Sequence, residues 1–244
     1  MSDPPEKARF LMNDFFTRTP QKKVFPAVFV LLLLLTLTGF LVSRPARASE
    51  EMSVIRLKVD PDAVERLLQE GEILIIKENE QGGRFKFVTA GVLINATPEE
   101  VWKTVTDYEH YPKFIPDCEK VVVTPGDAEN VILTNFTVAF KFSIIKYRVR
   151  YTLRQVHQKD KFRIDWTLKE GDLAEAIGAW ELIPLEGGKK TGAFYSAYSD
   201  LRSLGYLVKF LFKEQPVMEL ALTSTTAILM ARAVKAKMEG KELK

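Results

Sequence analysis

The sequence predicts an α+β fold in which an antiparallel sheet is followed by one long C-terminal helix. Residues 146–153 and 161–169 alternate between apolar and polar side chains, which is typical of strands with one covered face and one wet face. Residues 215–238 carry a wide apolar stripe at helical spacing, so this segment is expected to be a helix that packs against a large surface.

The first elements of the expected domain are a short helix and two strands. Residues 60–71 form the helix in this interpretation, because Asp60 can cap its start and Gly71 lies just beyond its end. The segments 73–77 and 84–94 are rich in apolar and β-branched side chains and are expected to be strands.

A second helix has a clear start signal. Thr97 is a good N-cap, Pro98 suits the first helical position, and Glu100 follows Thr97 at the spacing of a capping box. The helix carries Trp102, and a short aromatic helix that ends at Pro116 is expected to follow it.

The central part of the chain reads as a meander of strands joined by turns. Apolar and polar residues alternate in period two, and Pro, Gly and Asp residues separate the segments. The expected strands are 119–124, 131–142, 146–153, 161–169, 177–184 and 192–201.

The N-terminus has the pattern of an export leader. Residues 24–42 are uncharged and rich in Leu, with basic residues before them and Ala46 and Ala48 after them. We expect a secretory signal that is cleaved after Ala48, with an uncleaved membrane anchor as the alternative. Both interpretations place the rest of the chain in the periplasm, either free or anchored in the inner membrane and facing the periplasm.

Charge and residue counts exclude several classes of function. Residues 1–48 hold seven of the 35 Lys and Arg residues and three of the 32 Asp and Glu residues, so the rest has a net charge of −1 and is not expected to bind nucleic acid. Cys118 is the only cysteine, and His110 and His157 are the only histidines. No disulfide, metal site or cofactor is therefore expected.

Two segments and their surroundings resemble a known superfamily. Residues 94–102 and 107–116, with the meander and the helix that starts at Pro216, are similar to the START / polyketide-cyclase-like (SRPBCC) superfamily. The resemblance covers about 84–239 and is nearest to the quinone-chaperone branch and to exported bacterial members without an assigned ligand. It implies a helix-grip fold, in which a curved sheet wraps the C-terminal helix around an apolar cavity.

The leader pattern and the resemblance together give a domain organisation. Residues 1–48 are the leader or anchor, 49–83 form an N-terminal extension, and 84–244 form the START-like domain. Members of the superfamily bind sterols, phospholipids, quinones, hormones or polyketides, and a few cyclise their ligand. A hydrophobic small molecule or lipid is therefore the expected partner.

The alternation of faces along each strand and the apolar stripe of the last helix indicate which residues are expected to line the cavity. Aromatic side chains on the sheet face small side chains on the helix, which leaves volume between them. The candidates are Phe114, Tyr147, Tyr151, Ile164, Trp166, Trp180, Tyr195, Ala221, Ser224 and Ile228. The alternative is that these residues pack together with no room left, and that Ser224 bonds to its own helix.

The apolar run before the last helix is a candidate gate and membrane contact. Basic residues flank and interrupt it, which suits contact with an anionic bilayer surface, although a buried connection or the first turns of a kinked helix would show the same pattern. Its candidate residues are Leu204, Tyr206, Leu207, Phe210 and Phe212.

The leading functional hypothesis is binding, with transport, of a hydrophobic ligand in the cell envelope. One alternative is a cyclase- or aromatase-like enzyme, which needs an acid or base inside the cavity. No catalytic residue is assigned, because Asp165 and Glu181 fall on the outer face and His157 falls in an expected turn. The other alternative is an interaction module that docks a partner on an outer basic stripe of Lys146, Arg148, Arg150, Arg154 and Arg163.

Overall fold

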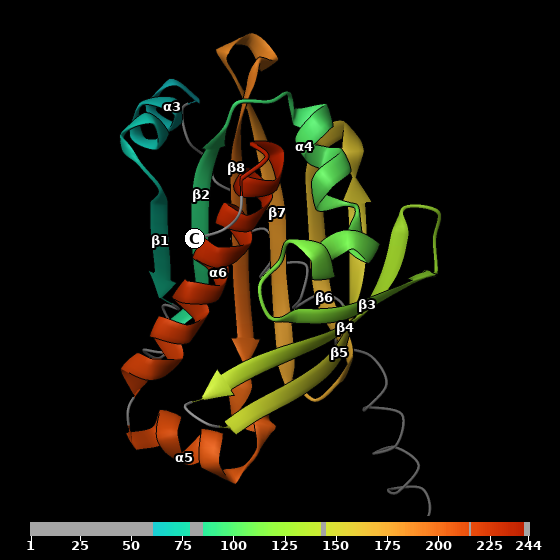
Figure 1. Cartoon of the computed structure of the whole chain (residues 1–244), viewed down its shortest axis with the longest axis vertical. Coiled ribbons are helices and arrows are strands. Elements are labelled where there is room, and N and C mark those ends of the chain that lie inside the picture. Colours follow the sequence, from blue (N-terminus) through green and yellow to red (C-terminus); the bar gives the residue numbers. More distant parts are fainter. Residues whose placement is uncertain (1–60, 79–84, 143–144, 215, 242–244) are drawn as a thin grey trace, which may run out of the picture. The chain divides into compact units, whose positions relative to one another are not determined.

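The computed structural model describes residues 61–78, 85–142, 145–214 and 216–241, and the predicted leader lies outside these ranges. One sheet dominates the described part (Figure 1). Its strands are β1 (Ile73–Glu78), β2 (Phe85–Ile94), β3 (Cys118–Pro125), β4 (Val131–Phe142), β5 (Ile145–Gln158), β6 (Arg163–Gly171), β7 (Glu175–Leu185) and β8 (Lys190–Asp200). All neighbours pair antiparallel, in the order β1-β2-β8-β7-β6-β5-β4-β3.

Five longer helical segments and three short ones complete the described chain. The longer ones are α3 (Pro61–Glu70), α4 (Pro98–Val105), the 3-10 helix η2 (Tyr108–Lys113), α5 (Tyr206–Glu214) and α6 (Pro216–Met238). The short 3-10 turns are η3 (Lys159–Lys161), η4 (Glu186–Gly188) and η5 (Leu201–Leu204). The predicted α+β fold with a long last helix is confirmed, and the predicted strands are all present.

Helix α6 crosses one face of the sheet in front of β2 and β8 (Figure 1). Ala227, Ala231 and Val234 are fully buried in one apolar cluster with Val92 and Ile94 of β2. The alanines allow the helix backbone to approach the sheet closely, which fixes this end of α6. Val217–Met238 is also long and apolar enough to span a membrane by length and composition, but here it packs on the sheet.

The predicted capping box of α4 is confirmed. The backbone N–H of Glu100 donates to the Thr97 hydroxyl at 3.3 Å, and the Thr97 N–H donates to the Glu100 carboxylate at 2.9 Å. The helix buries Val101, Trp102 and Val105 in the same cluster as α6. It is followed directly by η2, so the capped start of α4 sets where the η2 tyrosines lie.

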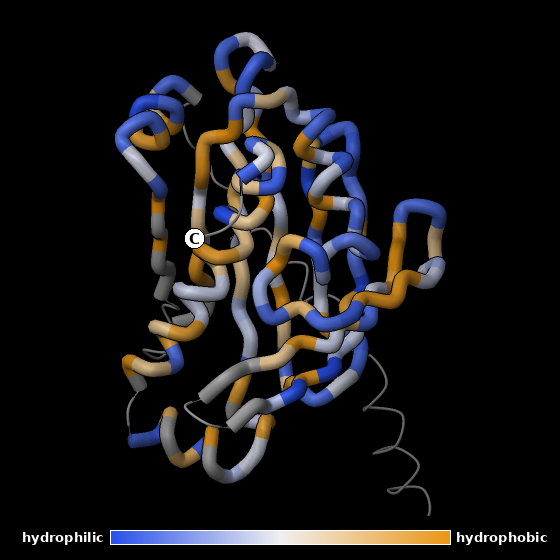
Figure 2. Tube along the Cα trace, in the orientation of Figure 1, coloured by the Kyte–Doolittle hydropathy of each residue, from blue (hydrophilic) through white to orange (hydrophobic). Residues whose placement is uncertain are grey.

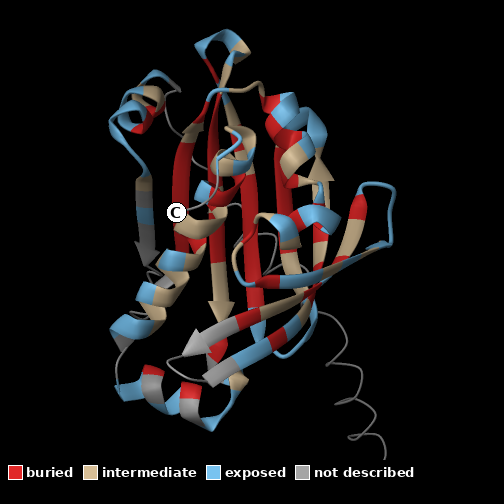
Figure 3. Ribbon diagram, in the orientation of Figure 1, coloured by how far each residue is buried: buried red, intermediate tan, exposed pale blue. Residues whose placement is uncertain are grey.

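The outer face of the central strands is not the wet face that the alternation predicted. The side chains of Arg163 and Asp165 are both about 95 % buried, with Arg163 Nη2 2.6 Å from Asp165 Oδ1. Gln158 donates to the second oxygen of Asp165 at 2.7 Å, and Arg163 Nη1 lies 3.4 Å from Glu181 Oε2. Pairing of opposite charges with hydrogen bonds allows this face to be covered. Burial is concentrated on these central strands (Figure 3).

Strand β5 is longer than predicted. The sequence indicated a strand at 146–153 and a turn at His157, whereas the strand runs from Ile145 to Gln158. The extension pairs with both β4 and β6, so ladder hydrogen bonds on two sides outweigh the weak apolar alternation of its last residues. His157 therefore lies on a strand.

Candidate ligand-binding cavity

A cavity of about 120 Å³ lies between the sheet, η2 and α6. One water molecule needs roughly 10–15 Å³ of such space, so side-chain packing does not close this region. The lining is mostly apolar and aromatic, and it includes Tyr108, Tyr111, Ile115, Pro116, Asp117, Cys118, Phe136, Val138, Tyr151, Leu153, Gln155, Trp166, Trp180, Tyr195, Thr226, Leu229 and Met230.

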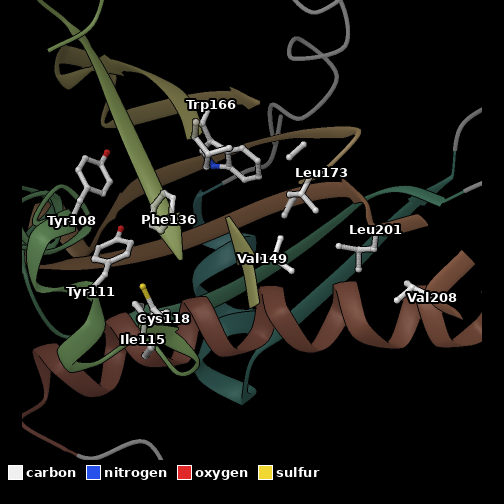
Figure 4. Close-up of a cluster of buried hydrophobic side chains, with 14 of the residues drawn as sticks. Tyr108, Tyr111, Ile115, Cys118, Phe136, Val149, Trp166, Leu173, Leu201 and Val208 are labelled. Carbon is white, nitrogen blue, oxygen red and sulfur yellow. The ribbon is translucent and has the colours of Figure 1, made fainter. Parts of the chain in front are cut away.

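A second chamber of about 70 Å³ adjoins the first. It shares lining residues of the sheet with the first chamber and extends from them toward Leu173, Leu201 and Thr223. Figure 4 shows this direction, with Tyr111 and Cys118 toward one end of the cluster and Leu201 toward the other. The residues that line both chambers are Tyr151, Leu153, Trp166, Tyr195 and Thr226.

The aromatic wall between the chambers is held by ring contacts. Trp166 stacks on Tyr195 with centroids 6.1 Å apart, and Tyr195 contacts Trp180 at 4.9 Å. Gly178 stands opposite Trp166 in the β6–β7 register, and a Cβ there would lie 2.1 Å from the indole. Glycine is therefore required at this position for the Trp166 ring to lie over β7.

The tyrosines of the cavity differ in their hydrogen bonds. The Tyr111 hydroxyl donates to the backbone carbonyl of Val105 at 2.7 Å, so its proton is not available to a ligand. The hydroxyls of Tyr151 and Tyr195 have no hydrogen-bond partner among the described residues. Burial raises the pKa of both phenols above the ordinary value, so both keep their protons and are donors.

Tyr108 connects the cavity to a histidine. Its hydroxyl lies 2.7 Å from Nε2 of His157, and the His157 ring meets Trp102 edge-on with centroids 5.7 Å apart. Burial lowers the pKa of His157, which favours the neutral imidazole, and burial raises the pKa of Tyr108. Sequence reasoning missed this pair because it placed His157 in a turn.

The electrostatic character of the cavity is nearly neutral. The described lining of both chambers holds no Lys, Arg or His, and its one carboxylate, Asp117, is exposed. Burial raises the pKa of Cys118 to about 11, so the group is a thiol and not a thiolate nucleophile. Within the described ranges, no three His, Cys, Asp or Glu side chains are placed to hold a metal ion.

A family model described as polyketide cyclase / dehydrase and lipid transport matches residues 94–216, which is half of the chain. The chain belongs to the polyketide cyclase / dehydrase and lipid transport family. The match begins at the end of β2 and includes α4, η2 and all the strands that line the cavity. No curated protein matches the sequence.

Solved structures of the START and aromatase/cyclase type share this family member's fold. A Thermus thermophilus protein superposes with a TM-score of 0.53 at 16% identity, covering 63% of this chain and 97% of its own. The Zhui aromatase/cyclase from Streptomyces gives 0.53 at 16% identity, covering 63% and 93%. A START superfamily protein from Mycobacterium smegmatis gives 0.51 at 16% identity, covering 64% and 98%. These likenesses show the fold, the predicted helix-grip arrangement.

The structure brings together four of the ten ligand-binding candidates. Tyr151, Trp166, Trp180 and Tyr195 line the cavity of this polyketide cyclase / dehydrase and lipid transport family member, where their contact with a ligand stays a prediction. Phe114 and Ile228 are half-buried and pack against the core behind the lining, and Ile164 is fully buried there. Ser224 is half-buried and also lies outside the lining.

Two candidates lie on the surface instead of the cavity side. Tyr147 on β5 is 41% exposed, and Ala221 is exposed on α6. The helix turns Thr226, Leu229 and Met230 toward the cavity. The wide apolar stripe of α6 did not reveal which of its sides faces the sheet.

The lining contains residues that the sequence did not single out. Tyr108 and Tyr111 belong to the aromatic segment before Pro116, for which the sequence already indicated a short helix. Leu153 and Gln155 continue the period of Tyr151 along β5, and that period was the available signal. Nothing in the sequence marked Thr226 over its neighbours.

Proposed function

We propose that the protein binds a hydrophobic small molecule or lipid non-covalently and carries it in the cell envelope. The observation that supports this best is the pair of adjoining chambers with an apolar, aromatic lining. Burying apolar ligand surface there is worth roughly 25 cal/mol per Å². A few hydroxyls in such a lining are sufficient to orient a ligand.

The predicted leader supports the envelope as the place of action. Its uncharged run at 24–42 and the Ala46–Ala48 site direct the rest of the chain across the inner membrane in this proposal. Mass spectrometry of the protein from its native envelope would locate the N-terminus. A mature start at Ser49 supports a free periplasmic carrier, and an intact N-terminus supports a carrier anchored in the inner membrane.

The cargo is tested by extracting the full-length protein from native membranes and identifying the bound lipids by mass spectrometry. Thr226→Phe fills the space where the two chambers meet, whereas Thr225→Phe places the same ring on the exposed side of α6. We expect an enriched apolar ligand in the wild type and in Thr225→Phe, and its loss in Thr226→Phe. Equal lipid content in all three would contradict the proposal.

The α5–α6 corner is proposed as the membrane contact. Tyr206 is 85% exposed and stacks on Phe210, which is 48% exposed, while Val217 of α6 is 72% exposed. Figure 2 shows the hydrophobic character of α5. The exposed Lys209 and Lys213 add positive charge for an anionic surface, with Glu214 beside them.

The predicted gate residues in and before α5 differ in exposure. Tyr206 and Phe210 are on the exposed side, whereas Phe212 is 3% exposed and belongs to the core cluster, which corrects its assignment as a surface contact. Leu204 is half-buried against the same cluster, and the side chain of Leu207 lies outside the described ones. Because the run is helical, its apolar residues face different sides, and only some of them are exposed.

Vesicle pelleting tests the membrane contact. We expect Phe210→Asp with Val217→Asp to abolish pelleting of residues 49–244 with anionic vesicles, and raised salt to weaken it in the wild type. Leu67→Asp is the control, because Leu67 is an exposed apolar helix residue on α3. Unchanged pelleting of the double variant would show that this corner is not the contact.

A cyclase-like enzyme is the second candidate, and the Tyr108–His157 pair is the observation that favours it. A hydroxyl that lines the cavity and contacts a neutral imidazole can transfer a proton to or from a ligand. Incubation with a synthetic poly-β-ketone, followed by mass spectrometry, separates the two functions. Cyclised product that is lost in Tyr108→Phe and kept in His110→Gln would establish catalysis, and recovery of intact compound supports the carrier.

The proposed interaction stripe is weakened by its ion pairs. Arg148 donates to Glu119 at 2.7 Å, Arg154 binds Asp127 through two nitrogens at 3.1 Å, and Arg163 is buried. Paired arginines have less charge to offer a partner. These ion pairs and the burial of Arg163 weigh against the interaction module.

A further inference from the structure

The two chambers meet at a point where polar groups from the sheet and the helix converge. Tyr151 from β5, Tyr195 from β8 and Thr226 from α6 each line both chambers. A ligand that occupies both chambers must therefore pass between these three side chains. Trp166, which stacks on Tyr195, forms the apolar floor of this junction.

The two phenols at the junction are hydroxyl donors that remain free in the cavity. Thr226 donates to the carbonyl of Leu222 on its own helix at 2.9 Å, and Tyr111 donates to Val105. Neither Tyr151 nor Tyr195 has a hydrogen-bond partner among the described residues, and neither hydroxyl is among the enclosed polar atoms that lack one. Both hydroxyls are therefore open to the cavity, where an acceptor would satisfy them.

The charge of the lining restricts what that acceptor can be. A buried carboxylate or phosphate needs a cation beside it, and the described lining provides no Lys, Arg or His. A neutral carbonyl oxygen needs none, and its two lone pairs accept from two O–H groups at once. Both phenols line both chambers, and Tyr195 is one electrostatic cause of the raised pKa of Tyr151, so the two side chains face the same junction.

We propose that Tyr151 and Tyr195 form a paired hydrogen-bond donor site at the junction, which selects an elongated neutral ligand with a carbonyl oxygen within its length. The ester or ketone oxygen accepts from both phenols, and the two apolar arms of the ligand occupy the two chambers. A charged end group lies outside the chambers or is absent. This inference rests on the proposed binding function and names the class of ligand.

Three probes of equal length test the site with the full-length protein in an alkyl maltoside, which contains no carbonyl. They are a mid-chain dialkyl ketone, the corresponding n-alkane and the corresponding carboxylic acid. A change in tryptophan emission as the probe enters reports binding, because Trp166 and Trp180 line the cavity. We expect the ketone to bind at least about tenfold more tightly than the alkane, and the acid at neutral pH to bind no better than the alkane.

The variants Tyr151→Phe and Tyr195→Phe remove one hydroxyl each. We expect each to weaken ketone binding about tenfold and to leave alkane binding unchanged. Tyr147→Phe is the matched control, because it removes an exposed hydroxyl from the same strand as Tyr151. Retention of the wild-type ketone preference in both variants would overturn the donor site.

The infrared carbonyl band of the bound ketone gives a second measurement that does not depend on affinity. Two O–H donors should shift the band to lower frequency in the wild type, and each Phe variant should return part of the shift. A bound ketone with an unshifted band overturns the inference while the binding function stands. Failure of all three probes to change the tryptophan emission of the wild type contradicts the binding function itself.

Discussion

The contact between Gly178 and Trp166 shows how one missing side chain creates the aromatic wall of the cavity. A Cβ on Gly178 would lie 2.1 Å from the indole and 2.2 Å from the backbone oxygen of Ser196. The backbone oxygen cannot move aside without disturbing the β7–β8 pairing. The wall therefore depends on a residue that contributes no atoms to it.

Gly178→Ala should destabilise the protein by about 1–3 kcal/mol, because the methyl group overpacks the interior. It should also displace the Trp166 ring, so the tryptophan emission spectrum should change. Chemical denaturation followed by fluorescence measures both effects. Gly192→Ala is the control, since the nearest atoms to a Cβ there are side-chain carbons at 3.2–3.4 Å, and an equal loss in both variants would contradict the close-contact explanation.

His157 gives the stability a defined dependence on pH. Burial lowers the pKa of His157 below its usual 6.5, so the unfolded chain binds more protons than the folded one once the pH falls below about 6.5. The folded state therefore loses stability as the pH falls from about 6.5 to the folded pKa of His157, and keeps this contribution in full at higher pH.

Denaturation between about pH 8 and about pH 5 measures this effect. His157→Gln should remove the part of the pH dependence that is due to the imidazole. His110→Gln, at a half-exposed site beside Asp107, is the matched control and should keep the part that is due to His157. Superimposable pH curves for the wild type and His157→Gln would contradict the assignment.

At the scale of elements, the start of α4 was predicted in detail because its signals are local. Thr97, Pro98 and Glu100 act on backbone groups within one turn, so their spacing determines the helix start without help from the rest of the fold. The end of β5 could not be predicted in the same way, because pairing with β4 extends it to Val156 and pairing with β6 extends it to Gln158.

Thr97→Ala should lower the stability of the protein by about 1 kcal/mol, since the N–H of Glu100 loses its side-chain acceptor. The loss should be small with Thr97→Ser, which keeps a hydroxyl at the cap. Denaturant midpoints of the three proteins provide the comparison. A Ser variant as unstable as the Ala variant would show that the methyl group, and not the cap, matters.

At the scale of the whole molecule, the sequence predicted the architecture better than the site. Alternation and helical spacing report how much of each element is covered, which was sufficient for the sheet and for α6. They do not report which side of a uniformly apolar helix is covered, so Ala221 was chosen and Thr226 was missed. The aromatic wall was found because Tyr151, Trp166, Trp180 and Tyr195 lie on strands with a clear period.

The unfilled space of the two chambers affects how the protein responds to hydrostatic pressure. Unfolding eliminates internal voids, so hydrostatic pressure favours the unfolded chain of a protein that contains them. The two chambers, of about 120 Å³ and about 70 Å³, make the empty protein sensitive to compression. Ligand that fills them should raise the pressure at which half of the molecules unfold, so compression would distinguish the ligand-bound protein from the ligand-free one.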